Sequence, residues 1–231
     1  MMSFQRVAIV MAAALFLQSC GTGLNIGMAP VLRNLTVDIQ PCGNPCTATT
    51  AGAFKFTASG NHLPIVFGAS VQASSGGQKL IPNLEFRVSS TANVLSPVDG
   101  VIASIEKNSG EDDYVVSIAH SALSEFSVEI DHVTELQVSA GDRVVAGQVI
   151  GKPGVWYPAD GIGRVELQLK RGGDFVCPLE YLASDVAAEV RNKMSGLLED
   201  WEEVRNDPSL YDQNSMVVPG CLRSSISGDD A

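Results

Sequence analysis

Four cysteines have spacings that suggest two different chemistries. Cys42 and Cys46 lie close together around a Gly-Asn-Pro turn, whereas Cys177 and Cys221 lie far along the chain. Thiols in an oxidising compartment pair as disulfides by default, and four thiolates that converge tetrahedrally hold zinc. Because only one close pair exists, we favour disulfides over a zinc site. Of the three possible pairings, the tight turn favours Cys42 with Cys46, which leaves Cys177 for Cys221.

The fifth cysteine, Cys20, follows a segment that is typical of an export signal. Arg6 is the only charged residue before an apolar run, Val7 to Leu17, that is too short to span a membrane, since a spanning helix needs about 20 residues. Leu17-Gln18-Ser19-Cys20-Gly21 resembles the bacterial lipobox, in which the cysteine is acylated and becomes the new N-terminus. The alternative is an ordinary secretory peptide in which Cys20 is incidental.

This pattern predicts where the protein is located. We expect residues 1–19 to be a lipoprotein signal peptide and Cys20 to be the lipidation site. The protein would then be lipid-anchored to a bacterial membrane in the cell envelope, with its body outside the cytoplasm, because acyl chains of this size hold a protein on a membrane surface.

The composition indicates a globular protein and argues against nucleic-acid binding. Of the 231 residues, 45% are hydrophobic and 18% are charged, which is enough apolar material for a core. The formal net charge of −11 repels phosphate backbones and offers no basic stripe. We therefore expect no nucleic-acid partner.

The order of short apolar segments indicates β structure in two blocks. Leu35–Ile39, Phe54–Phe56 and Leu63–Phe67 are β-prone and are separated by Gly, Ser and Thr, which predicts a small N-terminal β extension over residues 35–75. Residues 20–34 are predicted to be a lipidated tether that precedes it. From residue 76 to residue 182, short apolar runs recur between turn signals, which predicts a compact β domain.

A single amphipathic helix is predicted after the β domain, within residues 183–206. Its apolar residues follow spacings of three and four, Ser184 or Asp185 can cap it, and Pro208 cannot continue it. We interpret the apolar stripe as a face that packs on the β domain rather than as a partner-binding helix. Residues 207–231 are predicted to be a tail with a loose end.

Two glycine-containing segments lead to a family resemblance. Ser96-Pro97-Val98-Asp99-Gly100-Val101-Ile102 turns at Asp-Gly, and Val138–Gly151 turns at Gly141 and at Gly147. These segments resemble the barrel-sandwich hybrid domains and, more closely, the LytM/lysostaphin family of zinc peptidoglycan endopeptidases. The resemblance spans about Leu80 to Leu182. The resemblance implies a mainly β fold, namely a barrel-sandwich hybrid (LytM-like) domain. The small N-terminal β extension would precede this domain, and the one C-terminal amphipathic helix would follow it.

The resemblance also implies where catalytic and metal-binding residues would lie. Active members hold zinc with a histidine, an aspartate four residues later and the second histidine of a His-x-His segment, and two further histidines assist catalysis. Neutral imidazoles and a carboxylate suit this role because they leave one zinc position open for water. The metal positions fall on Ile81, Glu85 and Glu166, and the catalytic positions fall on His132 and Arg164.

This set of residues departs from the family pattern. Isoleucine cannot ligate a metal, and the Arg164 guanidinium would repel one while pairing with Glu166 or Glu85. The other two histidines of the chain, His62 and His120, are expected to be structural or surface residues. We therefore expect no intact catalytic set and no metal or other cofactor.

The predicted function is that of a non-catalytic LytM-like lipoprotein, a pseudoenzyme. It would act in cell-wall (peptidoglycan) remodelling or division by binding a cell-wall hydrolase, a division protein or peptidoglycan itself. One alternative is an active zinc peptidoglycan endopeptidase with the divergent ligands Glu85, His132 and Glu166. A second alternative is a periplasmic adaptor of a transport system, although such adaptors carry long helical hairpins that this sequence lacks.

Overall fold

The computed structural model describes residues 27–43, 45–56, 64–73 and 76–231. Cys20, the predicted signal peptide and His62 lie outside the described residues. Within the described residues, no helix is both long enough and apolar enough to cross a membrane.

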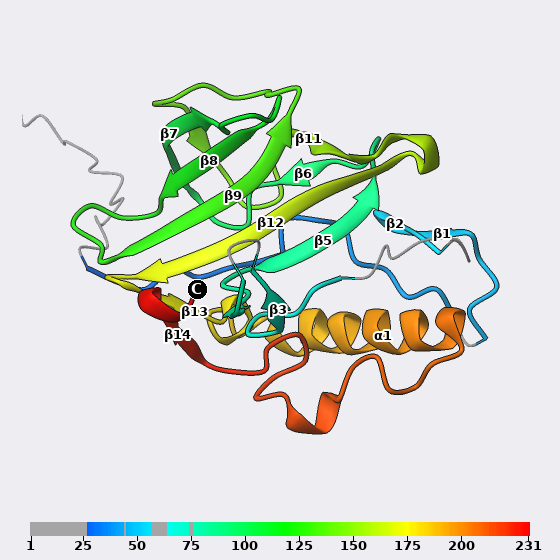
Figure 1. Cartoon of the computed structure of the whole chain (residues 1–231). Helices are drawn as coiled ribbons and strands as arrows, with labels where there is room; N and C mark the ends of the chain where they lie inside the picture. Colours follow the sequence, from blue (N-terminus) through cyan, green and yellow to red (C-terminus); the bar gives the residue numbers. More distant parts are fainter. Residues whose placement is uncertain (1–26, 44, 57–63, 74–75) are drawn as a thin grey trace, which may run out of the picture.

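The described chain is built around one large antiparallel sheet (Figure 1). Strand β9 pairs with β8 on one side, and on the other side it pairs first with β12 and then with β11. The ten strands of this sheet are β5 (Leu84–Ser89), β6 (Val94–Leu95), β7 (Gly100–Lys107), β8 (Tyr114–Ala119), β9 (Phe126–Thr134), β10 (Arg143–Val144), β11 (Val149–Tyr157), β12 (Ile162–Arg171), β13 (Asp174–Val176) and β14 (Ser225–Ser227).

The remaining regular elements are short, apart from one helix. They are the hairpins β1 (Thr50–Ala51) with β2 (Phe54–Lys55) and β3 (Ser70–Gln72) with β4 (Gln78–Leu80), the helix α1 (Ala187–Arg205), and the 3₁₀ turns Pro158–Asp160, Pro178–Glu180, Gln213–Ser215 and Gly228–Asp230. The prediction of a mainly β fold with one C-terminal helix is confirmed.

Alternation along β5 and β12 separates an apolar face from a polar face. Val165, Leu167 and Leu169 of β12 are fully buried in the core, as are Leu84 and Phe86 of β5. Successive side chains of a strand point to opposite faces. The residues between them, which include Glu85 and Glu166, therefore lie on the other face of the sheet, and this polar face carries the candidate site.

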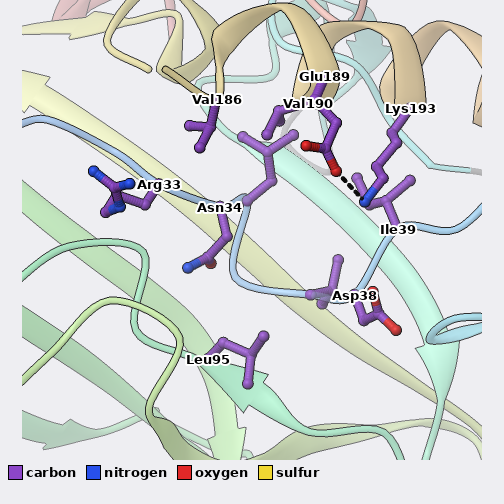
Figure 2. A pocket seen from close by; sticks show the side chains of 11 residues that line it. Arg33, Asn34, Asp38, Ile39, Leu95, Val186, Glu189, Val190 and Lys193 are labelled. Carbon is purple, nitrogen blue, oxygen red and sulfur yellow. Dashed lines mark ion pairs between the residues drawn. The ribbon is translucent and has the colours of Figure 1, made fainter. Parts of the chain in front are cut away.

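Helix α1 packs into the same core as the strands. Met194, Leu197, Leu198 and Trp201 are fully buried, and the Trp201 ring lies 5.2 Å from the ring of Phe56. This agrees with the interpretation that the apolar stripe faces the β domain. Figure 2 shows a pocket of about 170 Å³ between the first turns of α1 and the N-terminal segment, where the Glu189–Lys193 ion pair spans 2.8 Å.

The start of the helix differs from the prediction. Val186, not Ser184 or Asp185, occupies the N-cap position, and no side chain caps it. The Ala187 N–H donates to the Ala183 carbonyl at 2.9 Å, while the Asp185 carboxylate pairs with Arg33 at 2.6 Å. The Asp185 side chain, which was predicted to cap the helix, therefore forms an ion pair with the N-terminal segment instead.

The described part of the predicted tether, residues 27–34, and the predicted tail both contribute to the core. Leu32 lies inside the predicted tether of residues 20–34, yet it is fully buried and hydrogen-bonds to Tyr181 and Ala183 through its backbone. In the predicted tail, Ile226 is 3% exposed because β14 pairs with β13. Both segments bury apolar side chains that show no periodicity, so pattern alone could not assign them to the core.

One disulfide of the described chain closes a local turn, and a second joins two distant segments. Cys42 bonds to Cys46, and Cys177 bonds to Cys221, so the favoured pairing is confirmed. Cys177 and Cys221 are both fully buried, which places the second disulfide inside the core that joins the sheet to the C-terminal segment.

Candidate functional site

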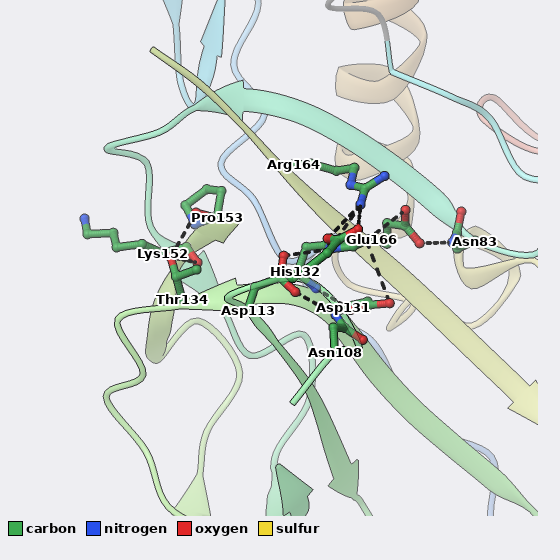
Figure 3. A network of polar contacts seen from close by, with 11 residues as sticks. Asn83, Asn108, Asp113, Asp131, His132, Thr134, Lys152, Pro153, Arg164 and Glu166 are labelled. Carbon is green, nitrogen blue, oxygen red and sulfur yellow. Dashed lines mark hydrogen bonds and ion pairs between the residues drawn. The ribbon is translucent and has the colours of Figure 1, made fainter. Parts of the chain in front are cut away.

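The candidate site is built around His132, which lies near the end of β9 and is 7% exposed. Its backbone has φ of 58°, in the left-handed region that non-glycine residues seldom adopt. The imidazole Nδ1 lies 2.8 Å from Asp113 Oδ2, and Nε2 lies 3.5 Å from Glu166 Oε1 (Figure 3). Both ring nitrogens are thus directed at carboxylates.

This environment favours the protonated imidazole. Burial lowers the pKa of His132, but the hydrogen bond to Glu166, the charge of Asp131 and the hydrogen bond to Asp113 outweigh burial and the nearby Arg164, and they raise that pKa to about 9. At neutral pH, His132 is therefore an imidazolium whose two N–H groups donate to carboxylates on either side.

Arg164 contacts the same cluster from β12, with a partner that differs from the prediction. Its guanidinium lies 3.3 Å from Glu111 and 4.1 Å from the centre of the Trp156 ring, an ion pair and a cation–π contact. Glu85 and Glu166, the predicted partners of Arg164, contact other residues. Glu85 pairs with Arg87 at 2.8 Å, and Glu166 accepts a short hydrogen bond from the Asn83 amide.

Glu111 also explains how two cations lie side by side. Arg164 Nη2 is 3.2 Å from His132 Nδ1, and both groups are donors when the imidazole is protonated. Glu111 Oε2 lies 3.1 Å from that same ring nitrogen and so offsets the repulsion. Acidic residues from the turn before β8 therefore offset the positive charges of His132 and Arg164.

The positions implied by the family resemblance come together only in part. Glu85 and Glu166 are register partners on β5 and β12, and Asp131, the neighbour of His132, is the partner of Glu166 on β9. Ile81 is 9% exposed, and its backbone hydrogen-bonds to Gly68 and Ala69, beside the β3–β4 hairpin. His120 lies at the far end of β8 and hydrogen-bonds to the backbone of Met28 instead.

Sequence reasoning missed several residues of the cluster. Asp113 is 4% exposed, and its carboxylate forms hydrogen bonds with His132 and Asn108. Asn83 is 7% exposed, and its Oδ1 has no hydrogen-bond partner in the described part of the chain. The signal for Asp113 was the acidic run Glu111-Asp112-Asp113 after Gly110, but such a run is also typical of an exposed turn.

A glycine permits this close packing. Gly154 of β11 lies beside the His132–Asp113 pair, and a Cβ added at Gly154 would lie 2.5 Å from Asp113 Oδ2 and 3.1 Å from His132 Cβ. Real Cβ atoms do not approach other atoms so closely, so any larger residue would push the buried carboxylate away.

The cluster does not fit the zinc site that the family resemblance implies. Two groups of three potential ligands exist among the described residues, Glu111 with Asp113 and His132, and Asp131 with His132 and Glu166. Both depend on His132, and a histidine ligates a metal only through a neutral ring nitrogen. Here the ring donates to the carboxylates on both sides, and a guanidinium lies 3.2 Å away.

One protein-family model matches part of this chain. The model of peptidase family M23 matches residues 82–173, which hold Glu85, His132, Arg164 and Glu166. No relative was found among curated proteins.

Solved structures with similar folds are distant in sequence. A structure of the SpoIIQ–SpoIIIAH pore forming complex is 20% identical over 53% of this chain and 76% of that chain, with a TM-score of 0.39. The catalytic domain of lysostaphin from Staphylococcus simulans is 18% identical over 45% and 75%, with a TM-score of 0.37. The catalytic domain of the prophage-encoded M23 protein EnpA from Enterococcus faecalis is 17% identical over 53% and 95%, with a TM-score of 0.39.

Proposed function

Residues 82–173 form a domain of peptidase family M23, and we propose that this domain works by binding rather than by catalysis. The protein is then a membrane-anchored, non-catalytic LytM-like lipoprotein. It acts in peptidoglycan remodelling or division by binding a cell-wall hydrolase, a division protein or peptidoglycan.

The observation that supports this proposal is the His132 cluster. Among the described residues, the one histidine at the site is His132, an imidazolium held between Asp113 and Glu166. A metal would have to displace the proton and approach the Arg164 guanidinium. Such a cluster gives a rigid, charged surface, whereas hydrolysis of an amide by this family needs a metal-activated water.

The surface beside the cluster is suited to a peptide ligand. A pocket of about 330 Å³ is lined by the side chains of Glu111, Asp112, Asp113, Val155 and Trp156. Val155 is 69% exposed, and the indole N–H of Trp156 has no acceptor in the described part of the chain. Carboxylates beside an aromatic ring attract a ligand that carries an amino group. Stem peptides of peptidoglycan and basic segments of protein partners both have this chemistry.

The membrane anchor is a separate part of the proposal. Acylation of Cys20 would keep the domain at a bilayer surface, which suits a protein that recruits partners to the envelope. Mass spectrometry of the mature N-terminus tests this directly. Cys20→Ala is expected to prevent acylation and to abolish flotation with membranes. An unmodified Cys20 in the wild-type protein would remove the anchor from the proposal.

Binding is tested with one charge reversal at the site and one far from it. Arg164→Glu should weaken capture of partners from a cell-envelope extract or of purified peptidoglycan. Arg171→Glu is the matched control, because Arg171 lies on the same strand, is 56% exposed and pairs with Glu125 away from the cluster. Unchanged binding by Arg164→Glu would remove this face from the proposed function.

One observation favours a second candidate, a zinc endopeptidase with a divergent ligand set. Potential ligand atoms of Asp131, His132 and Glu166 lie within 4.8 Å of one another, in place of the expected set with Glu85. Metal analysis together with dye release from labelled cell walls separates the two functions. Bound zinc, with turnover that is lost in His132→Ala, would replace the binding proposal.

A further inference from the structure

Three exposed apolar side chains lie where the described chain begins. Met28 is 54% exposed, Val31 is 56% exposed and Leu123 is 85% exposed. In Figure 1, the blue start of the chain and the β8–β9 loop, which holds Leu123, lie at the same end of the sheet. We call Met28, Val31 and Leu123 the apolar end patch.

Hydrogen bonds hold the start of the described chain against the β8–β9 loop. The Gly27 N–H donates to the Ala122 carbonyl at 3.4 Å. His120 Nε2 lies 2.8 Å from the Met28 carbonyl, and the Ser124 hydroxyl donates to the same carbonyl at 3.4 Å. A pocket of about 220 Å³ continues the surface from Met28 past Val31 to His120. The N-terminal segment and the loop thus form one surface.

Leu123 is an unusual residue for its backbone. Its φ is 58°, a left-handed conformation that glycine or asparagine adopts at lower cost than leucine. A solvent-exposed loop gains nothing from an apolar side chain at this position. The side chain is 85% exposed, so it is free to make an apolar contact outside the protein.

We propose that the apolar end patch lies on the lipid bilayer to which Cys20 is attached; this rests on the lipidation in the proposed function. The argument for a bilayer is the length of the chain between the anchor and the patch. Met28 is the eighth residue after Cys20, and a chain spans at most about 3.6 Å per residue, so Met28 lies within roughly 29 Å of the acylated cysteine. A linker this short keeps the patch near the bilayer, and a linker that is not fully extended allows the patch to contact the lipid.

This contact sets the position of the candidate site relative to the membrane. Strand β9 starts at Phe126, beside the patch, and reaches His132 six residues later. At about 3.3 Å per residue, the His132 cluster lies about 20 Å along the strand from the patch. The patch on the bilayer would thus hold the binding face up to that distance from the lipid, where a membrane-proximal partner or the inner surface of the wall can reach it.

The test uses the mature, lipidated protein in vesicles of phosphatidylethanolamine and phosphatidylglycerol. An environment-sensitive dye is attached to Leu123→Cys and, in a second variant, to Met28→Cys. Val155→Cys is the control, because Val155 is 69% exposed and lines the pocket beside the candidate site rather than the patch. We expect blue-shifted emission, and loss of most of that emission with nitroxide-labelled lipid, at positions 28 and 123 but not at position 155.

The outcomes separate this inference from the proposed function. Protein that fails to float with vesicles, and whose Cys20 is unmodified by mass spectrometry, contradicts the lipidation. Protein that floats while the dyes at positions 28 and 123 report water, as the dye at 155 does, overturns the contact with the bilayer. The latter result together with crosslinking from position 123 to an envelope protein would assign the patch to a protein partner instead.

Discussion

His132 Nδ1 lies 2.8 Å from Asp113 Oδ2, and each of these two side chains is at least nine-tenths buried. A buried charge is tolerated only when it is paired and hydrogen-bonded, so each residue depends on the other. The pair joins β9 to the turn before β8, and it is the most buried ionic contact of the candidate site.

Removal of the charge of Asp113 is expected to destabilise the fold. Asp113→Asn keeps the shape of the side chain but leaves the imidazolium with a weaker partner, and breaking a buried pair costs about 3–5 kcal/mol. Urea denaturation of the purified chain measures the loss. Asp112→Asn is the control, because the Asp112 side chain is 96% exposed and should have little effect. Equal effects of the two variants would contradict the assignment of a buried pair.

Stability should fall at alkaline pH because of His132. Its pKa is raised to about 9 in the folded chain and is near 6.5 when unfolded, so folding binds a proton more tightly. The stabilisation is complete below pH 6.5 and is lost as the pH rises through about 9. Denaturation curves at successive pH values measure this loss. In His132→Gln, the loss of stability between pH 6.5 and about 9 should disappear. If this loss persists in the variant, it comes from the titration of another group.

A methyl group at position 154 should disturb the same pair. The Cβ of Gly154→Ala would lie 2.5 Å from Asp113 Oδ2, and such overpacking costs about 1–3 kcal/mol. The His132 ring resonances in an NMR spectrum should shift as well. Gly173→Ala is the matched control, because a Cβ at Gly173 meets no atom within 4 Å. If Gly154→Ala changed neither the stability nor the His132 ring resonances, the strands would be able to move apart and the prediction would be wrong.

The two disulfides should contribute unequally to stability. Cys177 and Cys221 are 44 positions apart and fully buried, whereas Cys42 and Cys46 are four apart. A longer closed loop restricts the unfolded chain more, and loss of a native disulfide costs about 2–5 kcal/mol. Thermal melting should therefore show a larger loss for the Cys177→Ala, Cys221→Ala double variant than for the Cys42→Ala, Cys46→Ala one. A larger loss in the second variant would reverse this ranking.

The features that could be predicted from the sequence are those with a local signal. Short apolar runs between turn signals predicted the β domain, and the family resemblance placed Glu85 and Glu166 at metal positions before their register was known. The turn between Cys42 and Cys46 was enough to favour one disulfide pairing. The family resemblance then identified His132 and Arg164 as positions of interest.

The contacts that His132, Arg164 and Glu166 make could not be predicted, because these contacts depend on which strands pair. Asp113 reaches His132 only because β8 pairs with β9, and Trp156 lies under Arg164 because β11 pairs with β12. Asn83 precedes β5, and nothing in its sequence context points to Glu166. The burial of Leu32 has the same origin, since it pairs with a segment 150 positions away, at Leu182.

The Cys177–Cys221 disulfide also determines what a single proteolytic cut does to the molecule. The segment between these cysteines contains the whole of α1 and the 3₁₀ turn Gln213–Ser215. A protease that nicks this segment once leaves both fragments covalently joined, and the Phe67 backbone stays hydrogen-bonded to Gly220 and Leu222 on the far side of the cut. A nicked chain would separate into two pieces only under reducing conditions.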